Sequence, residues 1–387
     1  MQKPWLESYP SGVPHEISTD GYESLVDLYK EAIGEFSDRP AYTNMGKTIS
    51  YGELDKLTLS FAAWIRNETK LVKGDRIAVM MPNLLQYPVV VFGALRAGLV
   101  VVNTNPLYTD RELEHQLKDS GAKAIVVVEA FAHTVADVLD HTAVETVITT
   151  KFGDMLGFPK AMLVNFVIRK IKKMVPPFSL PQAHDFKDVI ATTPGTAADD
   201  AKLTLDDIAF LQYTGGTTGV AKGAMLTHKN MVSNANQALA WINSVDIKKG
   251  QEFIVTALPL YHIFALTANC MVFMKLGAQN LLITNPRDIP GFVKELGKYP
   301  FTALTGVNTL FNALLANEDF RKLDFSKMKV VLGGGMAVQE AVASDWKKVT
   351  GVTLVEAYGL TETSPACLLY TSPSPRDKRQ SRMPSSA

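Results

Sequence analysis

Apolar positions along the chain follow two periods, and the change between them marks the predicted elements. Residues 24–36 and 51–64 carry apolar side chains at helical spacing, which predicts two amphipathic helices. Residues 84–96 are more uniformly apolar and predict a buried helix. Thr109 is followed three residues later by Glu112, a spacing typical of a capping box at the start of a further helix.

Short apolar runs lie between the helical stretches and predict β-strands. They are found at 41–45, 76–81, 99–103, 124–128, 144–149, 208–211, 253–256, 280–283, 303–305, 330–332 and 353–355. Repeated alternation of strand and helix favours parallel sheets covered by helices on both faces. We therefore predict an α/β fold with two parallel-sheet subdomains layered with helices. The stretch 176–200 is rich in Pro, Thr and Ala and is a candidate division between the subdomains.

The stretch with the clearest chemistry is residues 213–223, which read Y-T-G-G-T-T-G-V-A-K-G. The predicted strand 208–211 precedes it, and the polar segment 227–236 follows it as the expected start of a helix. Its glycines allow a turn whose backbone N–H groups converge on an anion, above all a polyphosphate. The threonine hydroxyls can add donors or bind a metal ion, and Lys222 adds a positive charge.

This loop differs from the common P-loop, in which Lys directly follows Gly. Here Val220 and Ala221 separate Gly219 from Lys222, and Gly223 takes the place of the hydroxyl residue. Glycine-rich loops also occur as purely steric turns, so a turn without a ligand remains an alternative when the glycines are considered alone. The ordered set of glycines, threonines and lysine after a strand is more specific.

Two later stretches add to this loop. Residues 258–266 read L-P-L-Y-H-I-F-A-L, and residues 355–362 read V-E-A-Y-G-L-T-E. Together with the loop they resemble, in order and spacing, the motifs of the adenylate-forming (AMP-binding) enzymes. Within that family the chain is similar to bacterial long-chain fatty-acid–CoA ligases. The supporting phrases start at Met80 (M-M-P-N-L-L-Q-Y-P), Asn105 (N-P-L-Y-T-D-R-E-L) and Leu282 (L-I-T-N-P-R-D-I-P).

The resemblance implies a reaction in which a fatty acid and ATP form acyl-AMP and pyrophosphate, and coenzyme A then displaces AMP to give acyl-CoA. A carboxylate and a triphosphate are both anionic, so such a site must hold several negative charges close together. Mg2+, which prefers oxygen ligands, helps to meet that need. ATP, Mg2+ and coenzyme A are therefore the expected cofactors and co-substrates, with a fatty acid as the acid substrate.

The same resemblance assigns roles to individual residues. The expected catalytic residues are Lys222 in the loop that holds the β- and γ-phosphates, Thr361 at the α-phosphate and His262 beside the acyl carboxylate. Thr214 and Glu362 are the expected magnesium ligands. The nucleotide-binding residues implied by the match are Tyr213, Thr214, Gly215, Gly216, Thr217, Thr218, Gly219, Lys222, Gly333, Gly334, Gly335, Glu356, Tyr358, Gly359 and Thr361.

Some of these residues have simpler interpretations when the motifs are set aside. Glu362 by itself is typical of a solvated carboxylate at the start of a helix, and His262 by itself is typical of a packed histidine. The glycine run 333–335 by itself is typical of a strand-to-helix turn, and it also lets a flat ring approach the backbone. The resemblance implies that this ring is adenine, with Tyr358 stacked on it. Residues 306–308, after a predicted strand, are candidates for the apolar acyl pocket.

Composition narrows the class of protein. Of 387 residues, 47% are hydrophobic, which allows a sizeable core, and 39 basic residues balance 39 acidic ones. A net charge of zero argues against a nucleic-acid binder. The two cysteines, Cys270 and Cys367, lack metal-ligand spacing and indicate reduced thiols in a cytoplasmic protein. The N-terminal residues lack a signal-peptide pattern, and no transmembrane helix is predicted.

Residues 162–175 combine apolar side chains with Arg169, Lys170, Lys172 and Lys173. One interpretation is a helix on the cytoplasmic face of a membrane, with its apolar side in the lipid and its basic groups near lipid phosphates. The other is an ordinary surface helix with a solvated basic face. A long-chain substrate favours peripheral membrane contact, and a homodimer is a further expectation.

The likeness to the family extends to about Cys367, so residues 1–367 are expected to form an AMP-binding N-terminal domain. Residues 368–387 are rich in Ser, Pro and Arg, which predicts a disordered tail. Because the likeness to the family stops there, our hypothesis is that this tail is non-native, and the alternative is a short isoform with a flexible tail. The family's C-terminal domain, with its T-G-D motif, hinge and lysine, is not found in the sequence. The parent protein is expected to be a long-chain fatty-acid–CoA ligase. The alternatives are a medium-chain or aryl acid–CoA ligase and a non-catalytic fragment that binds a nucleotide or a fatty acid.

Overall fold

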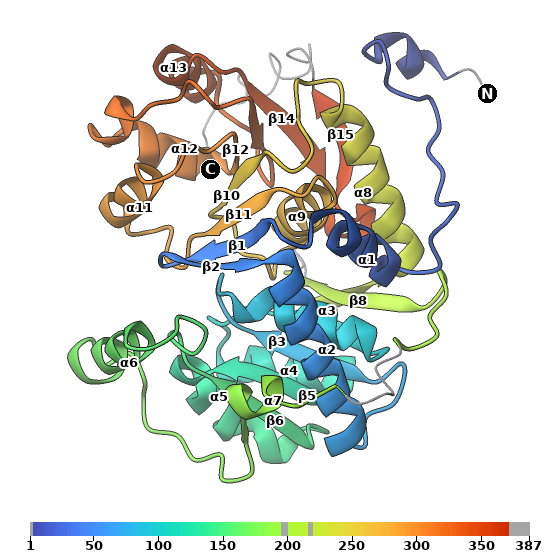
Figure 1. The fold of residues 1–387 in the computed structure, drawn as a ribbon, viewed down its shortest axis with the longest axis vertical. Helices are drawn as coiled ribbons and strands as arrows, with labels where there is room; N and C mark the ends of the chain where they lie inside the picture. The colour runs from blue at the N-terminus through green and yellow to red at the C-terminus, as the bar shows by residue number, and fades with distance from the viewer. Residues whose placement is uncertain (1–2, 195–199, 216–219, 371–387) are drawn as a thin grey trace, which may run out of the picture.

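Two β-sheets organise the chain, and each forms the centre of one lobe (Figure 1). The computed structural model describes residues 3–194, 200–215 and 220–370. The chain starts in the lobe at the top of Figure 1, passes to the lobe at the bottom and then returns to the first. Segments far apart in the sequence therefore share one sheet.

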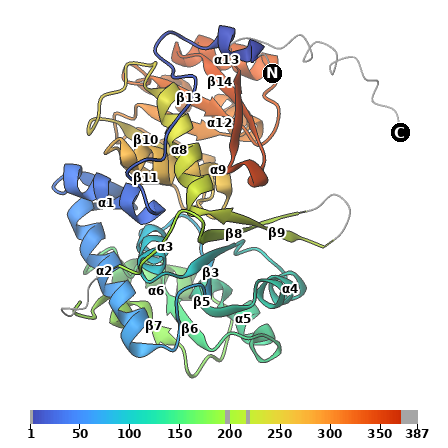
Figure 2. The same ribbon diagram turned by 90° about the vertical axis from the view of Figure 1, so that its right-hand side faces the viewer.

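The seven-stranded sheet forms the bottom lobe. It is parallel except at one edge, where β9 pairs with β8 in the antiparallel sense. The strands lie in the order β7 (His184–Asp185), β6 (Thr146–Thr150), β5 (Ala122–Val128), β3 (Arg76–Met80), β4 (Val100–Thr104), β8 (Ile208–Thr214) and β9 (Lys222–Thr227). Figure 2 shows the β8–β9 hairpin extending outward at the junction of the two lobes.

The eight-stranded sheet forms the top lobe and is antiparallel at both edges. Its interior strands are parallel, and β1 joins them through β11, far along the chain. The strands lie in the order β15 (Ala366–Tyr370), β14 (Leu354–Gly359), β13 (Val330–Gly333), β12 (Ala303–Gly306), β10 (Phe253–Thr256), β11 (Gln279–Leu282), β1 (Pro40–Asn44) and β2 (Lys47–Ser50).

Helices connect the parallel strands, because a parallel neighbour can be reached only by a crossover. The α-helices are α1 (Leu25–Phe36), α2 (Tyr51–Glu68), α3 (Gln86–Arg96), α4 (Asp110–Ser120), α5 (Ala132–Val138), α6 (Lys160–Phe166), α7 (Phe186–Ile190), α8 (His228–Ile242), α9 (Ile263–Ala265), α10 (Phe273–Lys275), α11 (Ile289–Leu296), α12 (Asn308–Leu315) and α13 (Glu340–Thr350). The π-helical turns are η4 (Val167–Ile171) and η5 (Leu266–Val272). The 3-10 turns are η1 (Pro4–Ser8), η2 (Glu129–Phe131), η3 (Leu139–His141), η6 (Phe320–Lys322) and η7 (Thr361–Thr363).

Central strands bury both of their faces, because successive side chains of a strand point to opposite sides. In β3, Ile77 and Val79 lie in an inner core between the two sheets, and Ala78 and Met80 lie in an outer core with α4 and α5. The inner core also contains residues of α1, α2, α3 and α8. A separate core on the far side of the eight-stranded sheet takes residues of α11, α12 and α13. The layers therefore alternate between helices and sheets.

The expected α/β fold with two largely parallel sheets layered with helices is confirmed. The predicted capping box at Thr109 is also confirmed, with Thr109 Oγ1 accepting from the Glu112 N–H and the Glu112 carboxylate accepting from the Thr109 N–H. None of the helices in the described part of the chain combines the length and apolar character needed to cross a bilayer.

Three expectations need correction. Residues 368–370 of the predicted disordered tail belong to strand β15, and residues 371–387 lie outside the part of the chain that the structure describes. Strand β9 was not predicted between the glycine-rich loop and the helix, because its residues, K-G-A-M-L-T, do not alternate between apolar and polar and carry little strand signal. The candidate division at 176–200 does not separate the sheets, since β7 lies within it and pairs with β6 of the same sheet. Pairing of β8 with β4 continues that sheet, so the chain changes lobes between β2 and β3 and again after β9.

A buried histidine links two of the inner helices. His228, the first residue of α8, is 1% exposed, and its Nδ1 accepts a hydrogen bond of 3.0 Å from the Leu25 N–H at the start of α1. Burial lowers the pKa of His228 from its ordinary value of 6.5 to about 4. The folded protein therefore holds this ring neutral, and protonation would remove the acceptor that α1 uses.

We expect His228 to make the fold sensitive to acid. A folded-state pKa below the unfolded one contributes stability above pH 6.5, and this contribution is lost as the pH falls from 6.5 toward 4. The loss from this residue should reach about 3 kcal/mol of unfolding free energy. His228→Asn keeps an acceptor near Nδ1 but does not titrate, so urea denaturation at a series of pH values should show a flatter profile for the variant.

His15→Asn is the matched control, because His15 is exposed. Its stability profile should follow that of the wild-type chain. If His228→Asn lost stability with acid as steeply as the wild type, another group would be responsible for the acid sensitivity.

Candidate functional site

The fold brings the glycine-rich loop and the Y-G-L-T-E stretch together. Thr214 ends β8 and Lys222 begins β9, and the two residues face each other in the antiparallel ladder. The turn η7, which carries Thr361 and Glu362, lies against both strands of this hairpin. Both predicted metal ligands and two predicted catalytic residues therefore lie on neighbouring elements, although they are far apart in the sequence.

Side chains of α4 hold both ends of the loop. The Tyr213 hydroxyl donates to the Asp119 carboxylate at 2.5 Å, and His115 Nε2 lies 2.9 Å from the Ala221 carbonyl oxygen. Tyr213 faces Gly223 across the ladder, and an added Cβ at Gly223 would lie 2.9 Å from the tyrosine ring. Glycine is therefore needed at 223 for the ring to lie against the backbone.

The described residues of the loop are accessible to a ligand. Gly215 and Lys222 are exposed, and Tyr213 and Thr214 are half-buried. An exposed ammonium beside a glycine-rich turn suits an anion. The predicted residues Gly216, Thr217, Thr218 and Gly219 lie outside the part of the chain that the structure describes.

The predicted glycine run follows β13 and lies beside β14. An added Cβ at Gly334 would lie 3.0 Å from the Phe264 ring and 3.2 Å from the Ala357 carbonyl oxygen. Gly335 has φ = +76°, in the left-handed region that favours glycine. Gly333, the last residue of β13, is buried. The run therefore places backbone without side chains next to the Y-G-L-T-E strand.

Two residues of β14 complete this part of the site. The Glu356 carboxylate accepts a hydrogen bond of 3.0 Å from the Val338 N–H, which ties the strand to the segment after the glycine run. Tyr358 is 48% exposed, so a flat ligand could stack on its ring. Both are predicted nucleotide-binding residues, and Glu356 lies opposite Gly333 in the ladder between β13 and β14.

Gly359 begins the tight turn that leads into η7. An added Cβ at Gly359 would lie 1.9 Å from the Pro365 carbonyl oxygen, so a larger residue requires the backbone to move. Within the turn, the Thr363 hydroxyl lies 3.0 Å from the Leu360 nitrogen and 2.9 Å from the Leu360 oxygen. Glu362 is exposed at the tip of this turn.

His262 precedes the short helix α9 and is exposed. Its Nδ1 accepts a hydrogen bond of 3.4 Å from the Phe264 N–H, which assigns the proton of the neutral ring to Nε2. Partial desolvation of the ring by neighbouring groups lowers the pKa of His262 below its ordinary value. At neutral pH the ring can therefore donate a hydrogen bond from Nε2–H to a carboxylate.

Two buried amide side chains hold the segment before His262, and sequence motifs did not identify them. Asn83 accepts from the Leu260 N–H at 2.8 Å and donates to the Leu258 carbonyl oxygen at 2.9 Å. Gln212 on β8 donates to the Tyr261 carbonyl oxygen. The strand that leads to the glycine-rich loop is thus also bonded to the His262 segment. A polar residue within an apolar run was the available sequence signal.

The residues at the hairpin fit one kind of metal site. Within the described residues, no group of three or more His, Cys, Asp or Glu side chains could enclose a metal ion. Glu362 is instead a single exposed carboxylate on a turn beside the strand that ends at Thr214. One carboxylate and one hydroxyl suit a Mg2+ that keeps its waters and takes further oxygen ligands from phosphates.

Comparison with known proteins identifies the family. The model of the AMP-binding enzyme family matches residues 29–386. The chain belongs to this family. A long-chain-fatty-acid–CoA ligase of Escherichia coli O157:H7 is 57% identical over 365 residues, and one of Haemophilus influenzae is 53% identical over 367 residues. Both matches cover 94% of this chain but 65% of the relative, so the chain spans about two thirds of the length of these curated relatives.

Solved structures of AMP-binding enzymes share the fold. An anthranilate CoA ligase, solved in complex with anthranoyl-AMP, matches 90% of this chain and 62% of its own with a TM-score of 0.76 at 18% identity. A long-chain-fatty-acid-CoA ligase from Archaeoglobus fulgidus matches 93% of this chain and 68% of its own with a TM-score of 0.76 at 23% identity. Identities this low support the fold alone.

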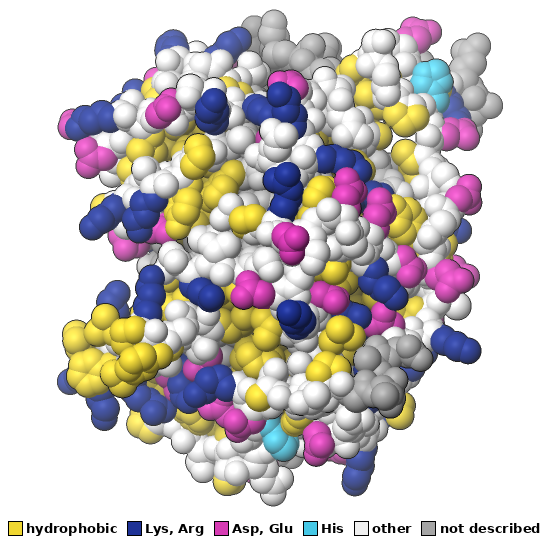
Figure 3. Space-filling model, viewed as in Figure 1, with side chains coloured by type: hydrophobic (Ala, Val, Ile, Leu, Met, Phe, Trp, Pro, Cys, Tyr) yellow, Lys and Arg dark blue, Asp and Glu magenta, His cyan; other side chains and the backbone are white. Residues whose placement is uncertain are grey.

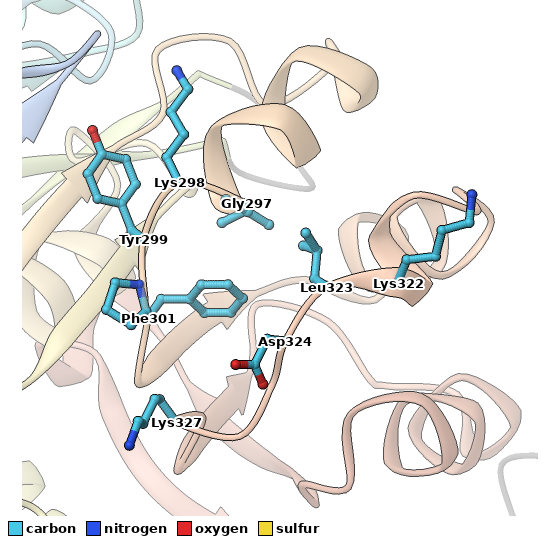
Figure 4. A pocket seen from close by; sticks show the side chains of 10 residues that line it. Gly297, Lys298, Tyr299, Phe301, Lys322, Leu323, Asp324 and Lys327 are labelled. Atoms are coloured by element: carbon cyan, nitrogen blue, oxygen red, sulfur yellow. The ribbon is translucent and has the colours of Figure 1, made fainter.

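A pocket of about 420 Å3 lies apart from these motifs, between the loop after α11 and the segment before β13 (Figure 4). Its walls are lined by Leu296, Gly297, Lys298, Tyr299, Pro300, Phe301, Lys322, Leu323, Asp324 and Lys327. None of these is a predicted site residue. The AMP-binding motifs therefore meet elsewhere, at the hairpin and the η7 turn.

We expect Gly359→Ala to disturb the turn that presents Glu362. The added methyl group meets the Pro365 carbonyl, so the turn must open, and overpacking of this kind costs about 1–3 kcal/mol. Thermal unfolding should show a lower Tm, and isothermal titration should show magnesium-ATP affinity reduced by about tenfold or more.

Gly34→Ala provides the control, because Gly34 lies within α1 and an added Cβ there meets no atom within 4 Å. This variant should be as stable as the wild type or slightly more stable, since alanine favours helices. Unchanged stability and ATP affinity in Gly359→Ala would contradict the tight turn.

Proposed function

We propose that this chain is the nucleotide- and acid-binding part of a long-chain fatty-acid–CoA ligase. In the complete reaction, a fatty-acid carboxylate displaces pyrophosphate from ATP to give acyl-AMP, and the thiol of coenzyme A then displaces AMP. The observation that carries the proposal is the contact of the η7 turn, with Thr361 and Glu362, against the β8–β9 hairpin, with Thr214 and Lys222. Relatives of that name at 53–57% identity support the substrate class.

The residues of the hairpin suit the triphosphate. We propose that the exposed Lys222 ammonium and the backbone N–H groups of the glycine-rich loop hold the β- and γ-phosphates, which makes pyrophosphate a better leaving group. Thr361 is proposed to donate a hydrogen bond to the α-phosphate, where the carboxylate attacks. His262 is proposed to orient that carboxylate through its Nε2–H, because its pKa keeps the ring neutral at pH 7.

Glu362 and Thr214 are the proposed magnesium ligands. A bound Mg2+ would neutralise charge that develops on the phosphates. An exposed carboxylate next to the strand that ends at Thr214 supports this assignment. Adenine is proposed to lie between the glycine run 333–335 and Tyr358. Val307, proposed for the acyl pocket, lies 3.6 Å from a Cβ built on Gly335 and thus beside this run.

Two other functions remain as candidates. An aryl acid–CoA ligase is supported by a 4-coumarate:CoA ligase 1 of Petunia hybrida, which is 27% identical over 351 residues. That identity is about half the value for the long-chain ligases, so we favour a fatty acid. The second candidate is a non-catalytic part that binds a nucleotide or a fatty acid. We also propose that residues 1–367 form the N-terminal domain of such a longer ligase.

The proposal predicts exchange of labelled pyrophosphate into ATP that depends on palmitate. Coumarate should support far less exchange. Glu362→Gln keeps the shape of the side chain but removes its charge, and it should lower the exchange rate by about 100-fold. Glu340→Gln, an exposed glutamate on α13, is the control and should exchange at the wild-type rate.

Different outcomes identify the alternatives. Pyrophosphate exchange that is faster with coumarate than with palmitate would favour the aryl acid ligase. ATP binding by titration without any exchange would favour the binding part. Full exchange by Glu362→Gln would contradict the metal-ligand role.

We further propose that α6 and η4 contact the cytoplasmic face of a membrane. One side of this segment packs on the inner core through Ala161, Val164 and Ile168. The outward side is apolar as well, and Figure 3 shows it as a patch of hydrophobic side chains over α6. The most exposed apolar residues of the segment and its flanks are Phe158 (87%), Met162 (64%), Leu163 (61%), Phe166 (55%), Ile171 (65%) and Met174 (47%).

Basic groups border this apolar patch. Arg169 pairs with the buried Glu129 at 3.2 Å, whereas Lys170, Lys172 and Lys173 are exposed around the end of η4. An apolar surface with neighbouring lysines suits an anionic bilayer, where the side chains enter the acyl region and the ammonium groups meet phosphates. A second copy of the chain, giving a homodimer, is the other candidate to cover the patch.

This membrane proposal is tested by flotation with vesicles of phosphatidylcholine and phosphatidylserine. Changing Met162, Leu163 and Phe166 to Ser should abolish flotation, and changing Lys170, Lys172 and Lys173 to Gln should weaken it most at low salt. The charge control uses three exposed lysines of α11 and α13, which are changed to Gln: Lys294, Lys347 and Lys348. If the serine variant floated as well as the wild type, the patch would not be the membrane contact. If sedimentation showed a wild-type dimer and a monomeric serine variant, a second copy of the chain would be the favoured occupant of the patch.

A further inference from the structure

Two buried polar side chains hold the turn that presents Thr361 and Glu362. Asn234 of α8 donates from Nδ2 to the Ala366 carbonyl oxygen at 2.8 Å and accepts at Oδ1 from the Ala366 N–H at 3.0 Å. Thr267 of η5 donates from its hydroxyl to the Ser364 carbonyl oxygen at 2.9 Å. Asn234 is 3% exposed and Thr267 is 1% exposed.

We propose that Asn234 and Thr267 are positioning residues that set the location of Glu362 relative to the β8–β9 hairpin. We refer to the two side chains as the clamp. The clamp acts on the backbone after η7 and has no contact of its own with a ligand in this assignment. The inference rests on the proposed function in one respect, the role of Glu362 as a magnesium ligand.

The turn gains support from outside because its strand, β15, pairs with a neighbour on one side only. Strand β15 lies at the edge of its sheet, and its register with β14 shifts between Tyr358 and Gly359. Ser364 has φ = +72°, a left-handed conformation that is unfavourable for a residue other than glycine and persists only where neighbours enforce it. The clamp bonds Ser364 and Ala366, the residues on which that conformation depends.

Asn234 replaces a missing strand neighbour. Its side chain presents an N–H donor and a C=O acceptor side by side, as a peptide group does, and the C=O and N–H of Ala366 use both. Nδ2 also donates to Gln237 Oε1 at 3.1 Å. A shorter or charged side chain cannot make both bonds. Removing the amide would leave two backbone groups of the half-buried Ala366 without these partners.

The clamp is anchored on the elements that carry the rest of the site. Helix α8 begins directly after β9, where Thr227 caps it through the Asn230 N–H. Asn234 therefore connects the strand that starts with Lys222 to the Glu362 turn. Turn η5 follows His262 and α9, and it packs against α8. Thr267 thus connects the His262 segment to the same turn.

The test compares Asn234→Ala and Thr267→Val with a control, Asn236→Ala. Asn236 lies on the same helix but bonds the Ser18 carbonyl oxygen at 3.0 Å, away from the turn. Hydrogen–deuterium exchange is followed for the peptide around residues 360–367, and affinity is measured by titration with magnesium-ATP and with ATP in EDTA.

In both clamp variants, the backbone amide hydrogens of this peptide should exchange with deuterium faster than in the wild type. Both variants should also bind magnesium-ATP about tenfold more weakly. Affinity for ATP in EDTA should change by less than about twofold, because a positioning role for Glu362 affects the metal-dependent part of binding. The control should match the wild type in all three measurements. If Asn234→Ala does not fold, Thr267→Val decides, because valine keeps the shape of threonine and removes only the hydroxyl donor.

Unchanged exchange over this peptide in both variants would overturn the clamp itself. Faster exchange with unchanged magnesium-ATP affinity would overturn its positioning role. Wild-type chain that binds ATP equally well with and without Mg2+ would refute the metal role of Glu362 and the positioning role with it. The exchange data would still report on the clamp, so failure of the proposed function and failure of the clamp give different results.

Discussion

The structure depends on the need of its parallel strands to bury both faces. Strands such as β3 and β5 alternate side chains between two cores, so helices must cover both sides of each sheet. The inner helices α1, α2, α3 and α8 serve both sheets at once, and this shared core joins the lobes. Only the sheet edges escape the constraint, and there the chain can form hairpins whose turns reach solvent.

The candidate site is built from two such edge hairpins. Strand β9 is the antiparallel edge of one sheet, and β15 is the antiparallel edge of the other. The first hairpin carries Thr214 and Lys222, and the turn of the second carries Thr361 and Glu362. Because both turns are free of crossover helices, their polar groups can face a charged ligand. Gly223 and Gly359 make the close backbone approaches that these turns require.

Buried polar side chains give these exposed turns fixed positions. Gln212 bonds the segment before His262, and Asn234 bonds the strand after η7. Each bond joins a turn to an element of regular structure, and a buried polar group that loses its partner destabilises the fold. The two histidines with lowered pKa also use a neutral side chain as a hydrogen-bond acceptor for a backbone N–H. His228 supports the inner helices, whereas His262 keeps a neutral ring at the surface of the site.

The sequence by itself determined the α/β class, most strands and helices, and the family motifs, because apolar period and glycine-rich strings are local signals. It did not reveal β9, whose residues K-G-A-M-L-T have no strong strand pattern and which forms because β8 offers an edge to pair with. Only tertiary structure brought Glu362 to the hairpin. It also showed that the chain passes from one sheet to the other outside residues 176–200. The roles of Asn83, Gln212 and Asn234 also depended on it, since a single amide gains a meaning only from partners that lie more than 40 residues away in the chain.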